Sequence, residues 1–272
     1  MRRERIRRRS PRPSRFAAKV LVLKGNVVIV TGVARRLGRE YCVRLSAMGA
    51  AVVAADVNSC EATAAEAGRT GGRVIALPLD VIDMDSAAAL AEGTFAEFGR
   101  IGGLVNNAAL YGGLRGRRSD AIADSEWDAA MAVNVKGIWH CCKAVVPKMR
   151  HGGGGSIVNV ASLAATYEMP FCLHYTTSKA AVIGLTRGLA REIGRDGIRV
   201  NAIAPSAILT EGTREFFSEK HDKALMTIRA GQSISRNLEP ADLVGAVAWL
   251  LSEGSALVTG QTISIDGGTV ML

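Results

Sequence analysis

The chain has 272 residues, of which 48% are hydrophobic and 22% charged, with 30 glycines and a formal net charge of +9. This ordinary globular composition excludes a disordered, collagen-like or coiled-coil protein. No apolar run approaches the ~18 residues that a membrane-spanning helix needs, so we predict no transmembrane segment and no membrane partner.

The first segment, residues 1–24, is strongly basic. Eight arginines and one glutamate lie in residues 1–15, so only +2 of the net charge of +9 belongs to the rest of the chain. Repelling charges together with Pro11 and Pro13 predict a disordered N-terminal extension. Such a tail could be a nucleic-acid arm, an organelle transit peptide or an anchor for anionic surfaces. We favour a dispensable leader, translated from a start codon placed too early, and expect no nucleic-acid partner.

From residue 25 onward, short β-branched runs alternate with longer Ala-rich stretches. Strands are predicted at residues 27–30, 51–55, 73–79, 103–105, 156–160, 198–202 and 262–265. Helices are predicted at residues 37–48, 85–98, 125–149 and 175–193, and a further helix follows the second strand and ends at about residue 67. Because the strands are apolar throughout, they are typical of parallel strands that helices cover on both faces. Residues 25–272 are therefore predicted to form a single α/β domain, a Rossmann-type doubly wound parallel sheet of about seven strands.

Two features of the first β-α-β unit predict a dinucleotide site. The first strand runs into a turn that holds Gly32 and Gly38, and such a turn lets backbone N–H groups reach a pyrophosphate at a helix N-terminus. Asp56 ends the second strand, 24 residues after Gly32. A carboxylate near that spacing accepts hydrogen bonds from the adenosine ribose and repels a 2′-phosphate. This favours NAD over NADP.

Further motifs make the resemblance to a known family specific. Asn106-Asn107-Ala108-Ala109 follows the fourth strand, Ser162 follows the fifth, and Tyr175-Thr176-Thr177-Ser178-Lys179 begins a helix. From about Lys24 to its C-terminus the chain resembles the short-chain dehydrogenase/reductase family, whose first loop reads TGxxxGxG and whose signature is YxxxK. The resemblance implies an NAD(P)-dependent oxidoreductase that acts on CH–OH groups.

The resemblance also implies which residues bind the cofactor. Asp80 and Val81 would contact adenine, and the segment from Pro205 to Thr210 would contact nicotinamide. The full set of cofactor-binding candidates is Gly32, Arg35, Arg36, Leu37, Gly38, Asp56, Asp80, Val81, Asn107, Ala108, Tyr175, Lys179, Pro205, Ile208 and Thr210.

One position departs from the family pattern. Arg36 stands where the loop usually has its middle glycine, which lets the backbone approach the phosphates closely. Its guanidinium could instead bind the pyrophosphate, or with Arg35 a 2′-phosphate, which would favour NADP. We give the carboxylate of Asp56 more weight than the two arginines and predict NAD, with NADP as the alternative.

The expected catalytic residues are Asn134, Ser162, Tyr175 and Lys179. Tyr175 and Lys179 are four residues apart on a predicted helix and so share a face. The ammonium is expected to lower the pKa of Tyr175 from its usual value of about 10, which makes the phenol an acid/base near neutrality. By resemblance, Lys179 also binds the nicotinamide ribose, Ser162 polarises the substrate oxygen, and Asn134 holds a water that links Lys179 to solvent.

A long segment without strand signal, residues 211–237, is predicted to form a substrate lid after the sixth strand. The substrate pocket is expected to be mostly apolar, which points to an alcohol or ketone with an apolar body. Its expected lining is Leu163, Ala164, Met169, Ile208, Leu209, Phe216 and Phe217.

Assembly and rival functions remain open at this point. The resemblance implies a homotetramer or homodimer packed through the helices near residues 125–149 and 175–193. The chain could instead be a non-catalytic dinucleotide-binding sensor or scaffold, although a sensor need not keep the proton donor. A second alternative is a 3-oxoacyl thioester reductase that uses NADPH.

The cysteines and histidines show no metal-binding pattern. The five cysteines include no CxxC pair, and no histidine lies at ligand spacing from them. We therefore predict no metal, no disulfide framework, and reduced, buried thiols in a cytoplasmic protein. His174 adjoins Tyr175 and is expected to point elsewhere, because neighbours do not share a helix face.

Overall fold

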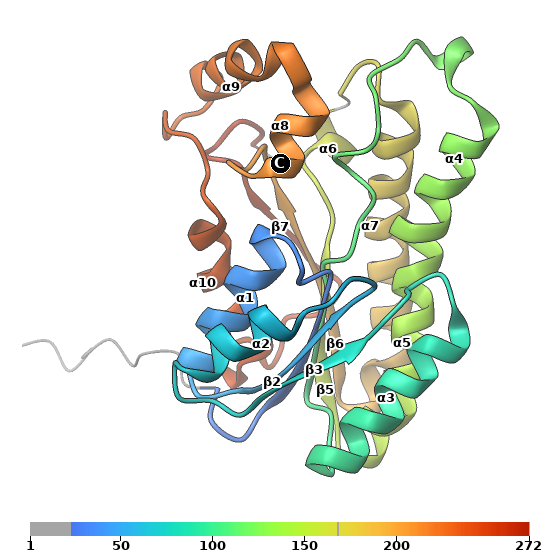
Figure 1. The fold of residues 1–272 in the computed structure, drawn as a ribbon, viewed down its shortest axis with the longest axis vertical. Helices are drawn as coiled ribbons and strands as arrows, with labels where there is room; N and C mark the ends of the chain where they lie inside the picture. Colours follow the sequence, from blue (N-terminus) through green and yellow to red (C-terminus); the bar gives the residue numbers. More distant parts are fainter. Residues whose placement is uncertain (1–22, 168, 272) are drawn as a thin grey trace, which may run out of the picture.

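The computed structural model describes residues 23–167 and 169–271, so nearly all of the basic extension predicted for residues 1–24 lies outside the described residues. The fold is built on a sheet of seven parallel strands in the order β3-β2-β1-β4-β5-β6-β7. Helices cover both faces of this sheet (Figure 1). The predicted doubly wound Rossmann-type sheet is confirmed.

The strands are short and mostly buried. They are β1 (Val27–Thr31), β2 (Ala51–Asp56), β3 (Val74–Pro78), β4 (Gly103–Asn106), β5 (Gly155–Val160), β6 (Ile198–Pro205) and β7 (Thr262–Ile265). The structure extends the sixth predicted strand by three residues, to Pro205. Pro78 ends β3 at one edge of the sheet, where proline is tolerated.

Two helical layers enclose the sheet. One face carries α1 (Arg36–Ala47), α2 (Glu61–Gly68) and α10 (Pro240–Leu251), and the other carries α3 (Met84–Phe98), α5 (Gly137–His151) and α7 (Leu173–Ile193) (Figure 1). Successive side chains of a strand point to opposite faces. In β1, Val28 and Val30 accordingly pack in the α1–α10 core, whereas Ile29 packs in the core beneath α3 and α5.

The helix predicted over residues 125–149 is confirmed, but it is not a uniform α-helix. It consists of α4 (Asp124–Met131), a π-helical turn η2 (Ala132–Lys136) and α5. The Gly137 N–H donates to the Ala132 carbonyl, five residues back. Asn134 lies in this π-turn, and such turns often occur at functional sites.

Residues 211–237 contain α8 (Glu211–Phe217), the short turn η4 (Ser218–Lys220) and α9 (His221–Ala230). Figure 1 shows α8 and α9 beyond one end of the sheet, together with the short α6 (Ala164–Tyr167). The remaining short turns are η1 (Ser119–Ala121), η3 (Gly194–Asp196) and η5 (Glu253–Ser255). Among the described residues, no helix has both the length and the apolar character needed to cross a membrane.

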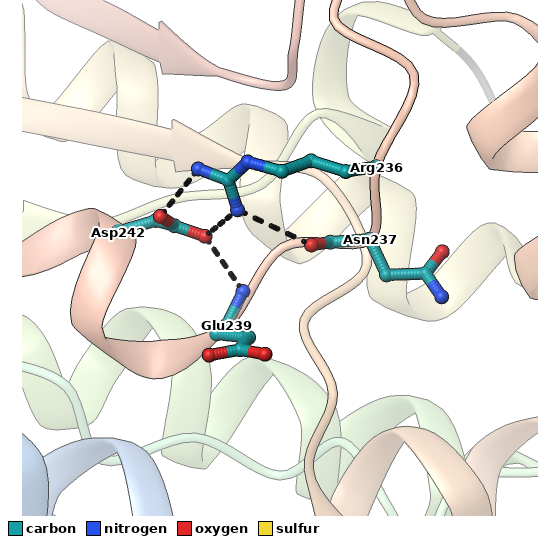
Figure 2. Close-up of polar contacts among 4 residues, drawn as sticks. All are labelled: Arg236, Asn237, Glu239 and Asp242. Carbon is teal, nitrogen blue, oxygen red and sulfur yellow. Dashed lines mark hydrogen bonds and ion pairs between the residues drawn. The ribbon is translucent and has the colours of Figure 1, made fainter.

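The end of this segment is fastened to α10. Arg236 donates two hydrogen bonds of 2.6 Å to the carboxylate of Asp242, which also accepts the Glu239 N–H at 2.8 Å (Figure 2). The guanidinium and this N–H hold the pKa of Asp242 below its usual range. The clamp fixes the residues that follow α9 against the first turn of α10.

Candidate active site

A cavity of about 1820 Å³ lies at the carboxyl ends of the strands. Loops that follow β1, β2, β3, β4, β5 and β6 line it, together with α8 and α9. Ligands of open α/β sheets bind at this edge. The volume exceeds that of a pocket for one drug-sized ligand, so the cavity has room for a dinucleotide and a substrate together.

The glycine turn after β1 is tightly packed against the loop after β4. A Cβ on Gly32 would lie 2.6 Å from Ala108 Cα, and a Cβ on Gly38 would lie 2.2 Å from the Gly32 carbonyl oxygen. The Asn107 side-chain amide donates to the carbonyls of Thr31 and Gly32 at 2.9 Å each. Within residues 23–167 and 169–271, no side chain caps the N-terminus of α1, so this end of the helix remains available to an anionic group.

Asp56 is fixed at the second strand end. Its carboxylate accepts the backbone N–H groups of Ala34 at 2.8 Å and Asn58 at 2.9 Å, and it lines the cavity. These features together fit a nicotinamide dinucleotide: the glycines leave no space for a side chain, the helix start is uncapped, and a carboxylate lies at the end of the next strand.

The two arginines of the loop are in different situations. Arg35 pairs with Glu215 of α8 at 2.9 Å, which bridges the glycine turn and the α8–α9 segment. Arg36 is exposed, lines the cavity and forms no ion pair within the described residues. Every predicted cofactor-binding residue lines this cavity.

Three of the four predicted catalytic residues meet in the same cavity. Ser162, Tyr175 and Lys179 are all buried and all line it. The ammonium of Lys179 donates to the Val160 carbonyl at 2.7 Å and lies 5.9 Å from the centre of the Tyr175 ring.

The expected effect of Lys179 on Tyr175 is wrong for this structure. Burial raises the pKa of Tyr175 to about 12, and the hydrogen bond with Ser162 opposes that rise, while Lys179 is not among the causes. Burial also lowers the pKa of Lys179 to about 8. The loss of solvation of the phenolate therefore favours the neutral phenol, and Tyr175 is protonated at pH 7.

Asn134 does not line the cavity. Its side chain is fully buried, accepts the Leu110 N–H at 2.7 Å, and donates to the Leu110 carbonyl at 3.1 Å and the Ser178 hydroxyl at 3.0 Å. Ser178 in turn donates to the Tyr175 carbonyl at 2.8 Å. Asn134 thus connects the loop after β4 to the helix that carries Tyr175. Its expected role in holding a water stays a prediction.

Sequence reasoning missed an aromatic contact at the reaction centre. Tyr111 stacks on Phe216 of α8 with ring centres 4.6 Å apart, and it lies 5.1 Å from the ring of Tyr175. A tyrosine in the loop after a strand belongs to no sequence motif, although its position just beyond the carboxyl end of a strand could have indicated a site residue.

The predicted substrate-lining residues all line the cavity except Leu209, which lies outside it. His174 is fully buried and outside the cavity, as expected.

Comparisons with known proteins agree with this geometry. The family model described as enoyl-(acyl carrier protein) reductase matches residues 32–270. An uncharacterized oxidoreductase of Mycobacterium tuberculosis is 41% identical over 248 residues, which cover 90% of this chain and 97% of the relative. A crystal structure of levodione reductase matches with a TM-score of 0.85 and 34% identity, covering 90% of this chain and 97% of that chain. NAD⁺-bound xylitol dehydrogenase matches with a TM-score of 0.84 and 28% identity, covering 90% and 99%.

The sheet, the glycine turn and the Ser-Tyr-Lys cluster define an oxidoreductase with a nicotinamide-dinucleotide site. The chain belongs to the short-chain dehydrogenase/reductase family. It is an enzyme that interconverts an alcohol and a ketone by hydride transfer with a nicotinamide cofactor.

Proposed function

We propose that the protein is an NAD-dependent reductase and dehydrogenase of secondary alcohols and ketones in which Tyr175 transfers the proton. The observation that carries this proposal is the meeting of Ser162, Tyr175 and Lys179 in one cavity with the glycine turn and Asp56. Bound nicotinamide would supply or accept the hydride. Tyr175 protonates the carbonyl oxygen during reduction, and Ser162, hydrogen-bonded to the phenol, orients that oxygen.

Other residues of the cavity are proposed to bind the cofactor. Lys179 is tied to the Val160 carbonyl, and we propose that it also binds the nicotinamide ribose. Gly32, Leu37, Gly38, Asn107 and Ala108 shape the phosphate side, Asp80 and Val81 the adenine side, and Pro205, Ile208 and Thr210 the nicotinamide side. The α8–α9 segment acts as the substrate lid.

We expect a preference for NADH over NADPH that depends on Asp56. Its carboxylate is fixed by two backbone N–H groups in the cavity, while the charge of Arg35 is already paired with Glu215. The wild-type kcat/KM for NADH should exceed that for NADPH at least about tenfold, and Asp56→Asn should reduce this ratio, because the amide no longer repels a 2′-phosphate. Glu66→Gln, a carboxylate change outside the cavity, is the control. A tenfold preference of the wild type for NADPH would overturn the assignment.

The function is tested with a panel of ketones and alcohols monitored by NADH absorbance. The lining of Leu163, Ala164, Met169, Ile208 and Phe216 favours substrates with an apolar body over phosphorylated sugars. Reduction of apolar ketones by NADH supports the proposal. Turnover confined to an acetoacetyl thioester with NADPH would instead identify a thioester reductase, and NADH binding without turnover of any substrate would identify a sensor.

We propose a homotetramer or homodimer in which α7 packs against a second copy. Exposed Ala180, Gly184 and Gly188 lie four residues apart on α7, and a Cβ on either glycine would meet nothing within 4 Å. Gly184→Arg should therefore convert the assembly to monomer in size-exclusion chromatography with light scattering, without loss of helix content, because arginine has the higher helix propensity. Gly245→Arg, on α10, is the matched control. A wild type that is monomeric would contradict the proposal.

A cytoplasmic location is proposed from the thiols. All five cysteines are buried and free. Burial raises the pKa of Cys172, beside Tyr175, to about 11, which keeps the thiol protonated and unreactive at neutral pH. Such a set is typical of proteins in reducing compartments.

A further inference from the structure

The rim of the cavity carries unusual backbone. Among the described residues, Phe171 with φ 64° and Ser218 with φ 48° are the only non-glycine residues with positive φ. Both line the cavity, Phe171 from the loop before α7 and Ser218 from the turn between α8 and α9. Bulky side chains are strongly disfavoured in this left-handed region, and such conformations cluster at ligand sites.

The backbone of Phe171 is held from both sides. Its carbonyl accepts the Arg117 N–H at 2.7 Å, and the next residue, Cys172, is buried at the start of α7. The Phe171 side chain gains little from this arrangement, because the residue is 64% exposed. Tyr167, at the end of α6, also lines the cavity and is 62% exposed. Folding alone therefore does not explain an aromatic residue at position 171, where glycine would relieve the strain.

An apolar surface surrounds the reactive phenol and includes Cys172, the residue that follows Phe171. Ala164, Cys172 and Phe216 form one buried cluster with Tyr175, and all four line the cavity. The hydroxyl of Tyr111, which also lines this region, is hydrogen-bonded to Thr213 of α8. These side chains give the cavity an apolar wall beside the reactive phenol.

We propose that Phe171, together with Tyr167, is a specificity-determining aromatic rim that binds an apolar ring in the substrate, beyond the carbon that reacts. The inference rests on the proposed function and narrows its substrate class to secondary alcohols and ketones that carry an aromatic or alicyclic group. Stacked and edge-on aromatic pairs supply the attraction to the ring of the substrate. The opposite end of the substrate, which carries the reacting oxygen, reaches Ser162 and Tyr175.

The test compares benzylacetone with butanone, which is the same methyl ketone without the phenyl ring. Phe171→Ala should lower the ratio of their kcat/KM values, benzylacetone over butanone, about tenfold. Phe171→Gly should lower that ratio equally but unfold at a higher urea concentration than Phe171→Ala, because glycine relieves the strain that alanine keeps. Phe171→Trp should preserve the ratio, and its emission should change on titration with benzylacetone, relative to the same titration of the wild type. Leu257→Ala, at a 99% exposed position outside the cavity, should leave the ratio unchanged.

The outcomes separate this inference from the proposed function. A ratio that Phe171→Ala leaves unchanged, or an emission of Phe171→Trp that benzylacetone does not alter, would refute the aromatic rim. An emission change without turnover of either ketone would support the rim and count against the proposed hydride transfer.

Discussion

Replacing Tyr175 with phenylalanine is expected to lower kcat by about 10³-fold, with the Kd for NADH changed less than about threefold. The phenol, which we propose as the proton donor, is buried, and its pKa of about 12 keeps it protonated at neutral pH. Removing a positioned acid typically costs 10²- to 10⁴-fold in rate. The ring itself remains, so its packing against Tyr111 and Phe216 is kept.

The matched control is Tyr41→Phe, which also removes a buried hydroxyl. Tyr41 lies on α1, outside the cavity, and its hydroxyl has no hydrogen-bond partner among the described residues. This variant should keep wild-type turnover. Stopped-flow fluorescence for NADH binding and steady-state absorbance for turnover separate the two effects. Substantial turnover by Tyr175→Phe would remove the acid/base assignment.

Lys179→Met is expected to lower kcat/KM at least about 100-fold while raising the free energy of unfolding at pH 6 by about 1–2 kcal/mol. Burial lowers the pKa of Lys179 to about 8 from 10.5. A lysine whose pKa is lower in the folded state destabilises the fold while it is protonated, and this cost disappears as pH rises from about 8 to 10.5. Methionine avoids the cost but loses the hydrogen bond to Val160, worth about 1 kcal/mol.

Urea unfolding at pH 6 and pH 10 tests this expectation. The stability advantage of Lys179→Met should shrink at the higher pH, where the wild-type lysine is neutral. Lys143→Met, at an exposed position on α5, should show no such pH dependence. An advantage of Lys179→Met that is the same at both pH values would show that desolvation of the ammonium is not its cause.

The parallel sheet and the cavity could be predicted because their signals are local. Uniformly apolar runs such as residues 27–30 identify buried strands, and the glycines at 32 and 38 mark a strand-to-helix connection that leaves no space for a Cβ. The order of Asp56, Ser162 and Tyr175 along the chain then places them at one edge of the sheet, because parallel strands share their carboxyl ends.

Other features depend on tertiary surroundings that a sequence pattern does not contain. The raised pKa of Tyr175 follows from the burial of its phenol, which a lysine four residues away in the sequence does not indicate. The π-turn at Ala132–Lys136 keeps the apolar pattern of a helix, so its extra residue leaves no periodic signal. Phe171 and Tyr111 lie in loops, where neither spacing nor composition indicates which way a ring points.

The π-turn also preserves the angular relationship within the rod formed by α4 and α5. In a π-turn residue i+5 takes nearly the position that residue i+4 has in an α-helix, so η2 absorbs one additional residue without turning α5 relative to α4. Asn134 lies in this wider turn and reaches Leu110 and Ser178, while Ile138 and Cys142 face the sheet core. Deleting one residue here would therefore leave the faces of α4 and α5 nearly unchanged and would remove only the widened turn that carries Asn134.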